Sequence, residues 1–366
     1  MKTIALVGLG HTHLEVVRRF RDRPPADTRV VCITDSPVAA YSGLLPAVLA
    51  GQAEESDWVI DLKPLCEADH IELVEQPMTG LSAADRRITL GDGSEVAFDV
   101  ASLDVGSVGG QTFADHPGNV AIKPMQTFLE RLRTQVADRP TDEELSVLLI
   151  GGGAGGVELA YTLPEFIRRE AGRECTVWLV EKREHLLPEL GAATGHNVAD
   201  ELRGRGVRVR TGCEVTAAEG YEVSLTTGRP VVADVLIELT GASGPAVLKQ
   251  TDLPLSDRGF VEIDPTLQVV SGAPVFAVGD CATHVENPWP KSGVYAVRQA
   301  AVLSQNLQAF LYANPLKSFK PQKSALKLVN RGDGTAWGVW HEQLVGGKWV
   351  YEWKKQLDRR HVKKYR

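Results

Sequence analysis

The sequence predicts an α/β fold built on two Rossmann-like units, because one pattern of apolar and glycine residues occurs twice. In each copy an apolar stretch leads into a glycine-rich turn, a helical stretch and a second apolar stretch that ends in an acid. The turns begin at Gly8 and Gly151. This order is the first part of a dinucleotide-binding βαβ unit, and its repetition indicates an internal duplication.

The first copy has an incomplete glycine fingerprint. Residues 2–9 predict a buried strand, residues 11–21 a helix, and residues 29–34 the next strand, which Asp35 closes. His13 stands where the third glycine of the fingerprint belongs. Taken alone, this turn fits a nucleotide site and an ordinary strand-to-helix turn equally well.

The second copy has the complete fingerprint. Gly151, Gly153 and Gly156 match G-x-G-x-x-G between a predicted strand over 145–150 and a predicted helix over 157–170. The first glycine permits a tight turn, the second lets the backbone approach a pyrophosphate, and the third lets the helix pack against the strand. The helix N-terminus then offers free N–H groups to the phosphates.

Glu181 closes the following strand, over 175–180. An acid at this place accepts hydrogen bonds from a ribose 2′-hydroxyl, which favours NADH. Lys182 and Arg183 come next and could instead contact a 2′-phosphate, so NADPH remains an alternative.

A third strand-to-helix junction lies near the C-terminus. Residues 275–280 (VFAVGD) predict a short buried strand that ends in Gly279-Asp280, and residues 293–311 predict a helix. The acid can hold a polyol hydroxyl, and the helix N-terminus can stabilise negative charge. The spacing of these residues alone also fits a strand-to-helix junction without a function.

The remaining segments predict smaller elements. Residues 88–96 and 222–232 have the alternation and turn glycines of β-hairpins. Near the C-terminus we expect a three-stranded meander over 325–330, 336–340 and 348–353. Beyond it, a short basic amphipathic helix is indicated by apolar and aromatic residues at intervals of four: Trp349, Trp353, Leu357, His361 and Tyr365.

Composition narrows the class of protein. Apolar residues make up 43% and charged residues 24%, which is typical of a soluble globular protein. No apolar run is long enough for a transmembrane helix. The net charge of −7 argues against nucleic acid as a partner, although residues 316–366 hold 13 Lys+Arg against 4 Asp+Glu. That segment is expected to have its own contact surface.

Metal and disulfide chemistry are not predicted. Five cysteines are scattered without a C-x-x-C pair, which fits a reducing cytoplasm. His11 and His13 are two positions apart, and such side chains on a helix do not face each other. We therefore expect no metal site.

Together these motifs resemble the pyridine nucleotide–disulfide oxidoreductase superfamily of flavoproteins over residues 1–315. Residues 41–46 and 152–160 are similar to type II NADH dehydrogenases. The sequence is more similar still to the flavoprotein family fused to, or encoded with, selenophosphate synthetase (selenide, water dikinase). That similarity lies in five segments: Gly-His-Thr-His at 10–13, residues 41–46, Lys123-Pro124, residues 290–298 and the Trp-rich tail.

The resemblance implies two three-layer β/β/α domains that bind FAD and NAD(P), the second inserted in the first. The expected ranges are 1–120 and 253–316 for the FAD-binding domain, 121–252 for the NAD(P)H-binding domain, and 317–366 for a small C-terminal β-meander and helix. The His13 departure is shared with the family and does not argue against FAD.

The resemblance also implies site residues. FAD would contact Gly8, Gly10, His11, Asp35, Ser42, Gly43, Leu44, Met78, Ser107, Gly279, Asp280, Gly293, Val294 and Tyr295. NADH would contact Gly151, Gly153, Gly156, Glu158, Glu181, Gly241 and Ala242. Among the FAD residues, the loop over 42–44 should lie beside the isoalloxazine and Asp280 should hold the ribityl chain. Lys123 is expected near the ring or, alternatively, is a surface cation.

The expected reaction is hydride transfer from NAD(P)H, NADH favoured, to FAD. No catalytic acid or base is required, because the flavin carries the chemistry. The superfamily's C-x4-C redox pair is missing, since residues 41–51 contain no cysteine. The expected electron acceptor is therefore a non-disulfide compound, and the similarity to type II NADH dehydrogenases suggests a quinone. The alternatives are an accessory subunit that docks to selenophosphate synthetase, and a reductase of a selenium or sulfur species.

The expected location is cytoplasmic. The basic C-terminus offers a peripheral contact with anionic lipid on the inner face of a membrane. In the simpler interpretation, its aromatic stripe packs on its own domain and its cations are merely solvated.

Overall fold

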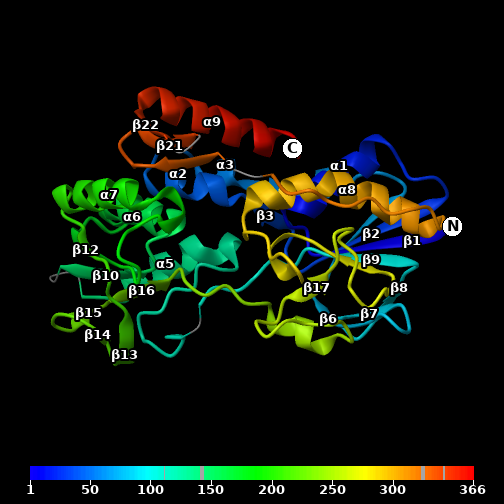
Figure 1. Ribbon diagram of the computed structural model, residues 1–366, viewed down its shortest axis with the longest axis horizontal. Helices are drawn as coiled ribbons and strands as arrows, with labels where there is room; N and C mark the ends of the chain where they lie inside the picture. Colours follow the sequence, from blue (N-terminus) through cyan, green and yellow to red (C-terminus); the bar gives the residue numbers. More distant parts are fainter. Residues whose placement is uncertain (111, 141–143, 323–325, 341–342) are drawn as a thin grey trace.

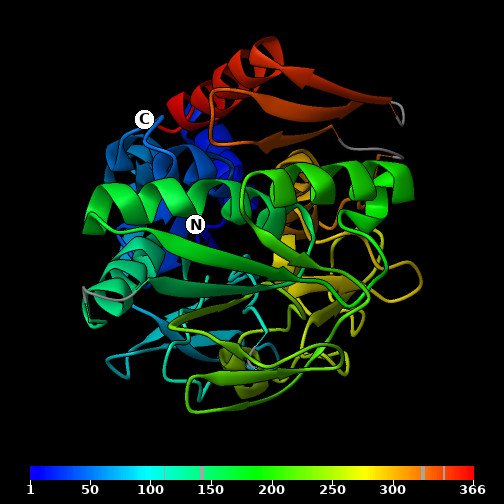
Figure 2. The same ribbon diagram turned by 90° about the vertical axis from the view of Figure 1, so that its left-hand side faces the viewer.

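The computed structural model describes residues 1–110, 112–140, 144–322, 326–340 and 343–366 (Figure 1). Two parallel sheets lie beside each other, and the C-terminal segment covers both of their domains on one side (Figures 1 and 2). The order of the strands in each sheet indicates where a cofactor would bind.

The first sheet has five parallel strands in the order β18-β9-β1-β2-β5. Their bounds are β1 (Lys2–Val7), β2 (Thr28–Thr34), β5 (Ile71–Glu75), β9 (Val100–Leu103) and β18 (Val275–Ala277). Ile4 of β1 pairs with Val30 on one side and with Val100 on the other. The chain order reverses at β1, and a ligand crevice is expected at the carboxyl ends of the strands at such a switch point. Helices α1 (His11–Asp22) and α8 (Gly293–Leu311) pack against each other over this sheet (Figure 1).

The second sheet has four parallel strands in the order β12-β11-β10-β16. Their bounds are β10 (Leu145–Ile150), β11 (Cys175–Val180), β12 (Arg208–Arg210) and β16 (Val235–Glu238). The helices of this domain are α5 (Phe128–Ala137), α6 (Ala154–Ala171) and α7 (Ala192–Gly204). Helix α6 runs through Pro164 and ends at Gly172, whose φ of 64° is left-handed.

Antiparallel sheets form the third layers. They comprise β6 (Met78–Ser82), β7 (Arg87–Leu90) and β8 (Glu95–Ala97), and β13 (Val215–Glu219), β14 (Glu222–Leu225) and β15 (Val231–Val232). Both predicted hairpins are confirmed, with the pairs Ile88–Val96 and Glu222–Val232. Strands of the first sheet precede and follow those of the second, which confirms the predicted α/β class with one domain inserted in the other. The predicted boundaries themselves stay predictions.

Short elements connect these layers. They are β3 (Val38–Ala40), β4 (Val59–Asp61), β17 (Val261–Ile263), β19 (Ala282–His284), α2 (Leu45–Leu49), α3 (Glu55–Trp58) and α4 (Leu62–Leu65), with 3₁₀ turns η1 (Ser42–Leu44), η2 (Met125–Thr127), η3 (Pro188–Leu190), η4 (Ala246–Gln250) and η5 (Gly279–Cys281). The turns η1 and η5 matter for function, because both border the crevice of the first sheet.

The C-terminal segment differs from its prediction in one element. Strands β20 (Lys327–Asn330), β21 (Ala336–Trp340) and β22 (Gln343–Gly347) form the antiparallel meander. The third strand, predicted over 348–353, was wrong, because helix α9 (Lys348–Lys363) begins there. Gly347, with φ 123°, turns the chain out of the meander. Residue 325, in the first predicted strand, lies outside the described residues.

The buried face of α9 also differs from the predicted stripe. The residues that α9 buries are Val350, Tyr351, Lys354, Asp358 and Val362. Trp349 and Leu357 of the predicted stripe are 59% and 38% exposed, whereas Tyr365, beyond the helix end, is buried. Because Lys354 and Asp358 lie among the apolar residues of this face, a search for apolar residues alone does not find it. None of the described helices is long and apolar enough to cross a membrane.

Candidate active site

The main pocket lies at the carboxyl end of the first sheet, where the strand order reverses. It has a volume of 460 Å³. The predicted FAD residues that line it are Gly8, Gly10, His11, Asp35, Ser42, Met78, Ser107, Gly279, Asp280 and Gly293, together with Lys123. Residues from well-separated segments of the chain thus meet in one pocket.

Four predicted FAD residues do not line this pocket. The Gly43 carbonyl accepts a 2.6 Å hydrogen bond from Lys354 of α9, and Leu44 borders a smaller cavity beneath that helix. Val294 is 40% exposed. The Tyr295 hydroxyl donates to the Gln322 carbonyl at 3.3 Å. A contact of these residues with FAD stays a prediction.

His13 occupies the space of the missing third glycine through specific contacts. Its ring nitrogens lie 2.5 Å from the Gly8 carbonyl oxygen and 2.8 Å from Ser102 Oγ. Burial lowers the pKa of His13 to about 4, so the ring is neutral near pH 7. The imidazole therefore tethers α1 to β1 and β9, and this accounts for the tolerance of His13 in the fingerprint.

Asp104 is a pocket residue that the sequence analysis missed. Its Oδ2 atom accepts hydrogen bonds from the backbone amides of Thr12 and His13, at 2.9 and 3.0 Å. Burial is the largest cause that raises the pKa of Asp104, to about 7. The available signal was its place, because it directly follows the buried strand β9, as Asp35 follows β2.

Lys123 is paired inside the pocket. Its Nζ atom lies 3.0 Å from Asp280 Oδ2 and donates a 2.6 Å hydrogen bond to Ser107 Oγ. The side chain is 30% exposed, so it is not a free surface cation. The ammonium compensates the Asp280 carboxylate, which was predicted to hold the ribityl chain.

The pocket fits FAD. Gly8 has φ 75°, and a Cβ atom on it would lie 2.5 Å from the Asp104 carbonyl oxygen, so only glycine permits this turn. His11 Nδ1 is buried and has no hydrogen-bond partner among the described residues. It can therefore bond a bound cofactor. The N-termini of α1 and α8 also face the pocket through His11 and Gly293.

The second glycine loop has the geometry of a pyrophosphate site. Gly151 has φ 117°, and a Cβ atom on Gly156 would lie 1.9 Å from the Gly151 carbonyl oxygen. A Cβ atom on Gly153 or Gly155 would meet no described atom within 4 Å. The loop therefore packs tightly on its inner side and is open on its outer side, where a dinucleotide would approach.

Glu181 holds this loop in place. Its carboxylate accepts hydrogen bonds from the amides of Gly152 and Arg183, at 2.6 and 2.8 Å. Lys182 is paired with Glu214, whose carboxylate lies 2.8 Å from its Nζ atom. Neither contact tests the predicted bond from Glu181 to a ribose.

The other predicted NADH residues lie after β16 and within α6. Gly241 has φ 68° and lies after β16, and the Ala242 carbonyl accepts from Arg258. Glu158 points elsewhere, since its carboxylate accepts a 2.8 Å hydrogen bond from the Asn330 amide of β20. Burial raises the pKa of Glu158 to about 7.

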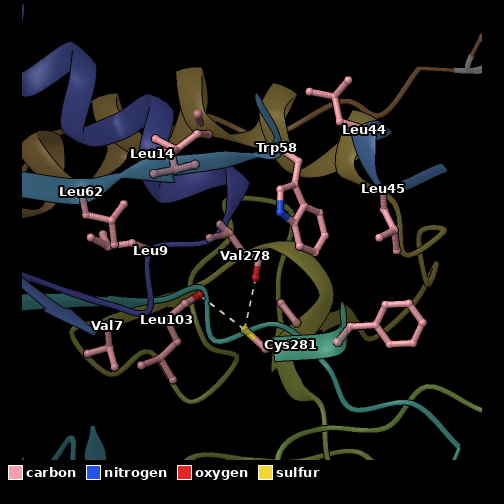
Figure 3. Packing of buried hydrophobic residues seen from close by; sticks show 14 of the residues in the cluster. Val7, Leu9, Leu14, Leu44, Leu45, Trp58, Leu62, Leu103, Val278 and Cys281 are labelled. Atoms are coloured by element: carbon pink, nitrogen blue, oxygen red, sulfur yellow. Dashed lines mark hydrogen bonds between the residues drawn. The ribbon is translucent and has the colours of Figure 1, made fainter. Parts of the chain in front are cut away.

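All five cysteines are free. Cys281 is buried behind the pocket, and its thiol contacts the carbonyls of Leu103 and Val278 at 3.5 and 3.2 Å (Figure 3). Burial raises its pKa to about 12, so it is a thiol near neutral pH. Among the described residues, no group of His, Cys, Asp and Glu is arranged to hold a metal ion.

The chain belongs to the pyridine nucleotide-disulphide oxidoreductase family, which it matches over residues 2–300. Family membership supports FAD and a pyridine nucleotide as its cofactors. When bound, FAD supplies the redox chemistry, and the residues described here bind and orient it.

Several curated relatives match the sequence, and two of them are NADH dehydrogenase-type proteins. The chain is 29% identical over 209 residues to the type II NADH:quinone oxidoreductase of Haemophilus influenzae, which covers 54% of this chain and 47% of that protein. The chain therefore matches about half the length of that relative. It is 22% identical over 330 residues to the NADH dehydrogenase-like protein YutJ of Bacillus subtilis, covering 88% of this chain and 87% of that protein.

Many solved structures share the fold, and two of them align over nearly the whole chain. NDH2 from Plasmodium falciparum in complex with NADH aligns with a TM-score of 0.83 at 14% identity, over 99% of this chain and 96% of that one. The sulfide:quinone oxidoreductase of Aquifex aeolicus aligns with a TM-score of 0.81 at 18% identity, over 100% and 92%.

Proposed function

We propose that this protein is an FAD-dependent NADH dehydrogenase that passes electrons to a quinone or another non-disulfide acceptor. One observation carries the proposal. The chain combines a complete dinucleotide loop at Gly151–Gly156 with an FAD-type pocket. The segment beside this pocket, residues 41–51, contains no cysteine. Electrons that enter as hydride therefore have no disulfide on this loop to reduce.

The donor side rests on the second glycine loop. Its open outer side can receive the pyrophosphate, and the N-terminus of α6 can stabilise the phosphate charge. NADH is favoured over NADPH because Glu181, at the end of β11, is an acid of the kind that accepts from a ribose hydroxyl, and because Lys182 is paired with Glu214. The protein's contribution is to hold the nicotinamide and the flavin in a reactive orientation.

The acceptor side is proposed to lie beneath α9. The turn η1 separates two cavities, since Ser42 lines the large pocket and Leu44 lines a small one of 20 Å³. Lys354 and Asp358 border the small cavity and form a 2.8 Å ion pair. The Lys354 ammonium is a hydrogen-bond donor and can bond a quinone oxygen at the edge of this cavity.

Peripheral membrane contact through α9 is a further part of the proposal. Trp349 and Leu357 are exposed, and cations on the same helix are exposed too: Lys348, Arg359, Arg360 and Lys363. Apolar side chains flanked by cations favour the surface of an anionic bilayer. The Haemophilus relative, named as a quinone oxidoreductase, supports a lipid-soluble acceptor.

The predicted association with selenophosphate synthetase stays a prediction, as does the predicted cytoplasmic location. Neither the described contacts nor the relatives named above favour that partner over a quinone. The same holds for reduction of a selenium or sulfur species.

Anaerobic mixing tests the proposal. The purified holoprotein is mixed with NADH and, separately, with NADPH, and the flavin absorbance is followed. We expect fast bleaching by NADH and slower bleaching by NADPH, then reoxidation by a soluble quinone but not by an oxidised dithiol compound. A flavin that stays oxidised with both nucleotides would contradict the donor assignment, and reoxidation by the disulfide alone would contradict the acceptor class.

A further inference from the structure

Asp104 lies where two cofactor-binding loops of the pocket meet. A Cβ atom on Gly10 would lie 2.6 Å from its carboxyl carbon, and one on Gly279 would lie 2.3 Å from its Oδ1 atom. Both loops therefore need glycine because this carboxyl group stands between them. We propose that Asp104 positions FAD at the N-terminus of α1 and takes up one proton when FAD binds.

The first step of the argument concerns the amides of α1. Asp104 Oδ2 occupies the N–H groups of Thr12 and His13, two of the first three of the helix. An anion bound at a helix N-terminus normally uses these groups. In α6, by contrast, the loop is open at Gly153 and Gly155. The FAD diphosphate must therefore share the α1 terminus with a carboxyl group.

The second step is that Asp104 cannot easily leave this position. His13 fixes the first turn of α1 through its bonds to Gly8 and Ser102. Thr12 Oγ1 donates a 2.9 Å hydrogen bond to the Ala296 carbonyl and so ties the same turn to α8. The side chain of Asp104 is buried, at 5% exposed. Rotation would leave two buried amides without an acceptor, which destabilises the fold.

The third step is the charge balance around Asp104. From η5 it faces Asp280, whose negative charge opposes ionisation, and Cys281, a buried thiol. From α1 it faces His13, which is neutral near pH 7, and Thr12. The cation next to Asp280 is Lys123, and it is already paired with that carboxylate.

The diphosphate of FAD would add negative charge beside this group. Two negative groups in contact inside a pocket are not both ionised unless a cation compensates them. The pKa of Asp104 is already raised to about 7 without the cofactor, because the carboxyl group is buried. With FAD bound it should rise further. A proton from solvent then converts the carboxylate to a carboxylic acid, whose hydroxyl can donate to a phosphate oxygen.

The inference rests on FAD as the cofactor and not on the proposed acceptor. Its test is binding of FAD to full-length apoprotein, followed by titration calorimetry in two buffers of different ionisation enthalpy. We expect uptake of about one proton per FAD at about pH 8, and almost none at about pH 5.5, where Asp104 is protonated before binding. The affinity should fall about tenfold for each pH unit above about 7.

The variant Asp104→Asn identifies the group. Its side-chain oxygen can still accept from Thr12 and His13, so FAD should bind, with an affinity that no longer depends on pH and without proton uptake. The control is Asp99→Asn, because Asp99 also accepts from a backbone amide, that of Thr3 in β1 at 2.7 Å, but at the opposite end of β9. It should keep both the pH dependence and the proton uptake.

Three results would overturn the proposal. They are pH-independent FAD affinity of the wild-type protein with no proton uptake, unchanged proton uptake in Asp104→Asn, and loss of the uptake in Asp99→Asn. If Asp104→Asn does not fold, Asp104→Ser removes the carboxyl group with a smaller side chain. It should bind FAD more weakly and equally at all pH values, and a surviving pH dependence would again contradict the assignment.

Discussion

The Tyr41 hydroxyl donates a 3.0 Å hydrogen bond to Asp358 Oδ1, and this bond joins the loop beside the large pocket to helix α9. The Tyr41 ring also stacks on His361, with ring centroids 4.4 Å apart. Burial raises the pKa of Tyr41, so the phenol stays protonated and remains a donor. The C-terminal segment is thus tied to the loop that borders the large pocket.

Tyr41→Phe should destabilise the protein by about 1–2 kcal/mol, because a buried carboxylate loses one donor. Urea unfolding at pH 7 measures the change. The matched control is Tyr312→Phe, whose hydroxyl donates to the Ala26 carbonyl at the surface. Its effect should stay within about 0.5 kcal/mol. Equal losses in both variants would argue against a structural role of the Tyr41–Asp358 bond.

Lys123→Met should weaken FAD binding at least about tenfold. The substitution leaves the partly buried Asp280 carboxylate without its cation, in the place where the ribityl chain is expected. FAD release on dilution, followed by flavin fluorescence, gives the affinity. Lys182→Met is the control, since Lys182 pairs with Glu214 at the surface, 72% exposed. Wild-type FAD retention in Lys123→Met would place the cofactor away from this ion pair.

Gly156→Ala should slow flavin reduction by NADH at least about tenfold while FAD stays bound. A Cβ atom at this position would lie 1.9 Å from the Gly151 carbonyl oxygen, so α6 and the glycine loop must separate. Anaerobic stopped-flow mixing measures the rate. Gly204→Ala serves as control, because a Cβ atom there, in α7, meets nothing within 4 Å. Normal reduction in Gly156→Ala would contradict the assignment of this loop to NADH.

Cys281→Ala should leave NADH oxidation unchanged within about twofold. The thiol is buried behind the pocket, and its pKa of about 12 keeps it protonated, so it is a poor nucleophile. The lost packing should cost about 1–2 kcal/mol of stability, which thermal unfolding would report. A variant that binds FAD and folds but cannot reoxidise its flavin would show that a cysteine carries electrons after all.

The sequence predicts those parts of the candidate site that lie on glycine turns and at strand ends. Gly8, Gly151 and Asp280 each follow a buried strand, and parallel strands bring their carboxyl ends to one edge. Asp104 was missed although it obeys the same rule, because no glycine fingerprint marks its loop. Its partners, the amides of Thr12 and His13, belong to the backbone and leave no trace in a pattern of side chains.

The C-terminal helix was harder to predict because its buried face is partly charged. Lys354 and Asp358 pair with each other and with Gly43 and Tyr41, partners more than 300 residues away. Such contacts exist only in the folded chain. The search for an apolar stripe therefore predicted a buried face with Trp349 and Leu357, which are exposed in the structure.

These two exposed residues carry the last prediction. Trp349→Ser combined with Leu357→Ser should lower binding to vesicles that contain anionic lipid at least about tenfold, because the apolar anchors of α9 are lost. Cosedimentation measures it, and flavin reduction by NADH should be unchanged. Val232→Ser is the control, since Val232 is 54% exposed on the distant strand β15. Wild-type protein that does not bind these vesicles, or equal losses in both variants, would exclude α9 as a membrane contact and leave a soluble acceptor.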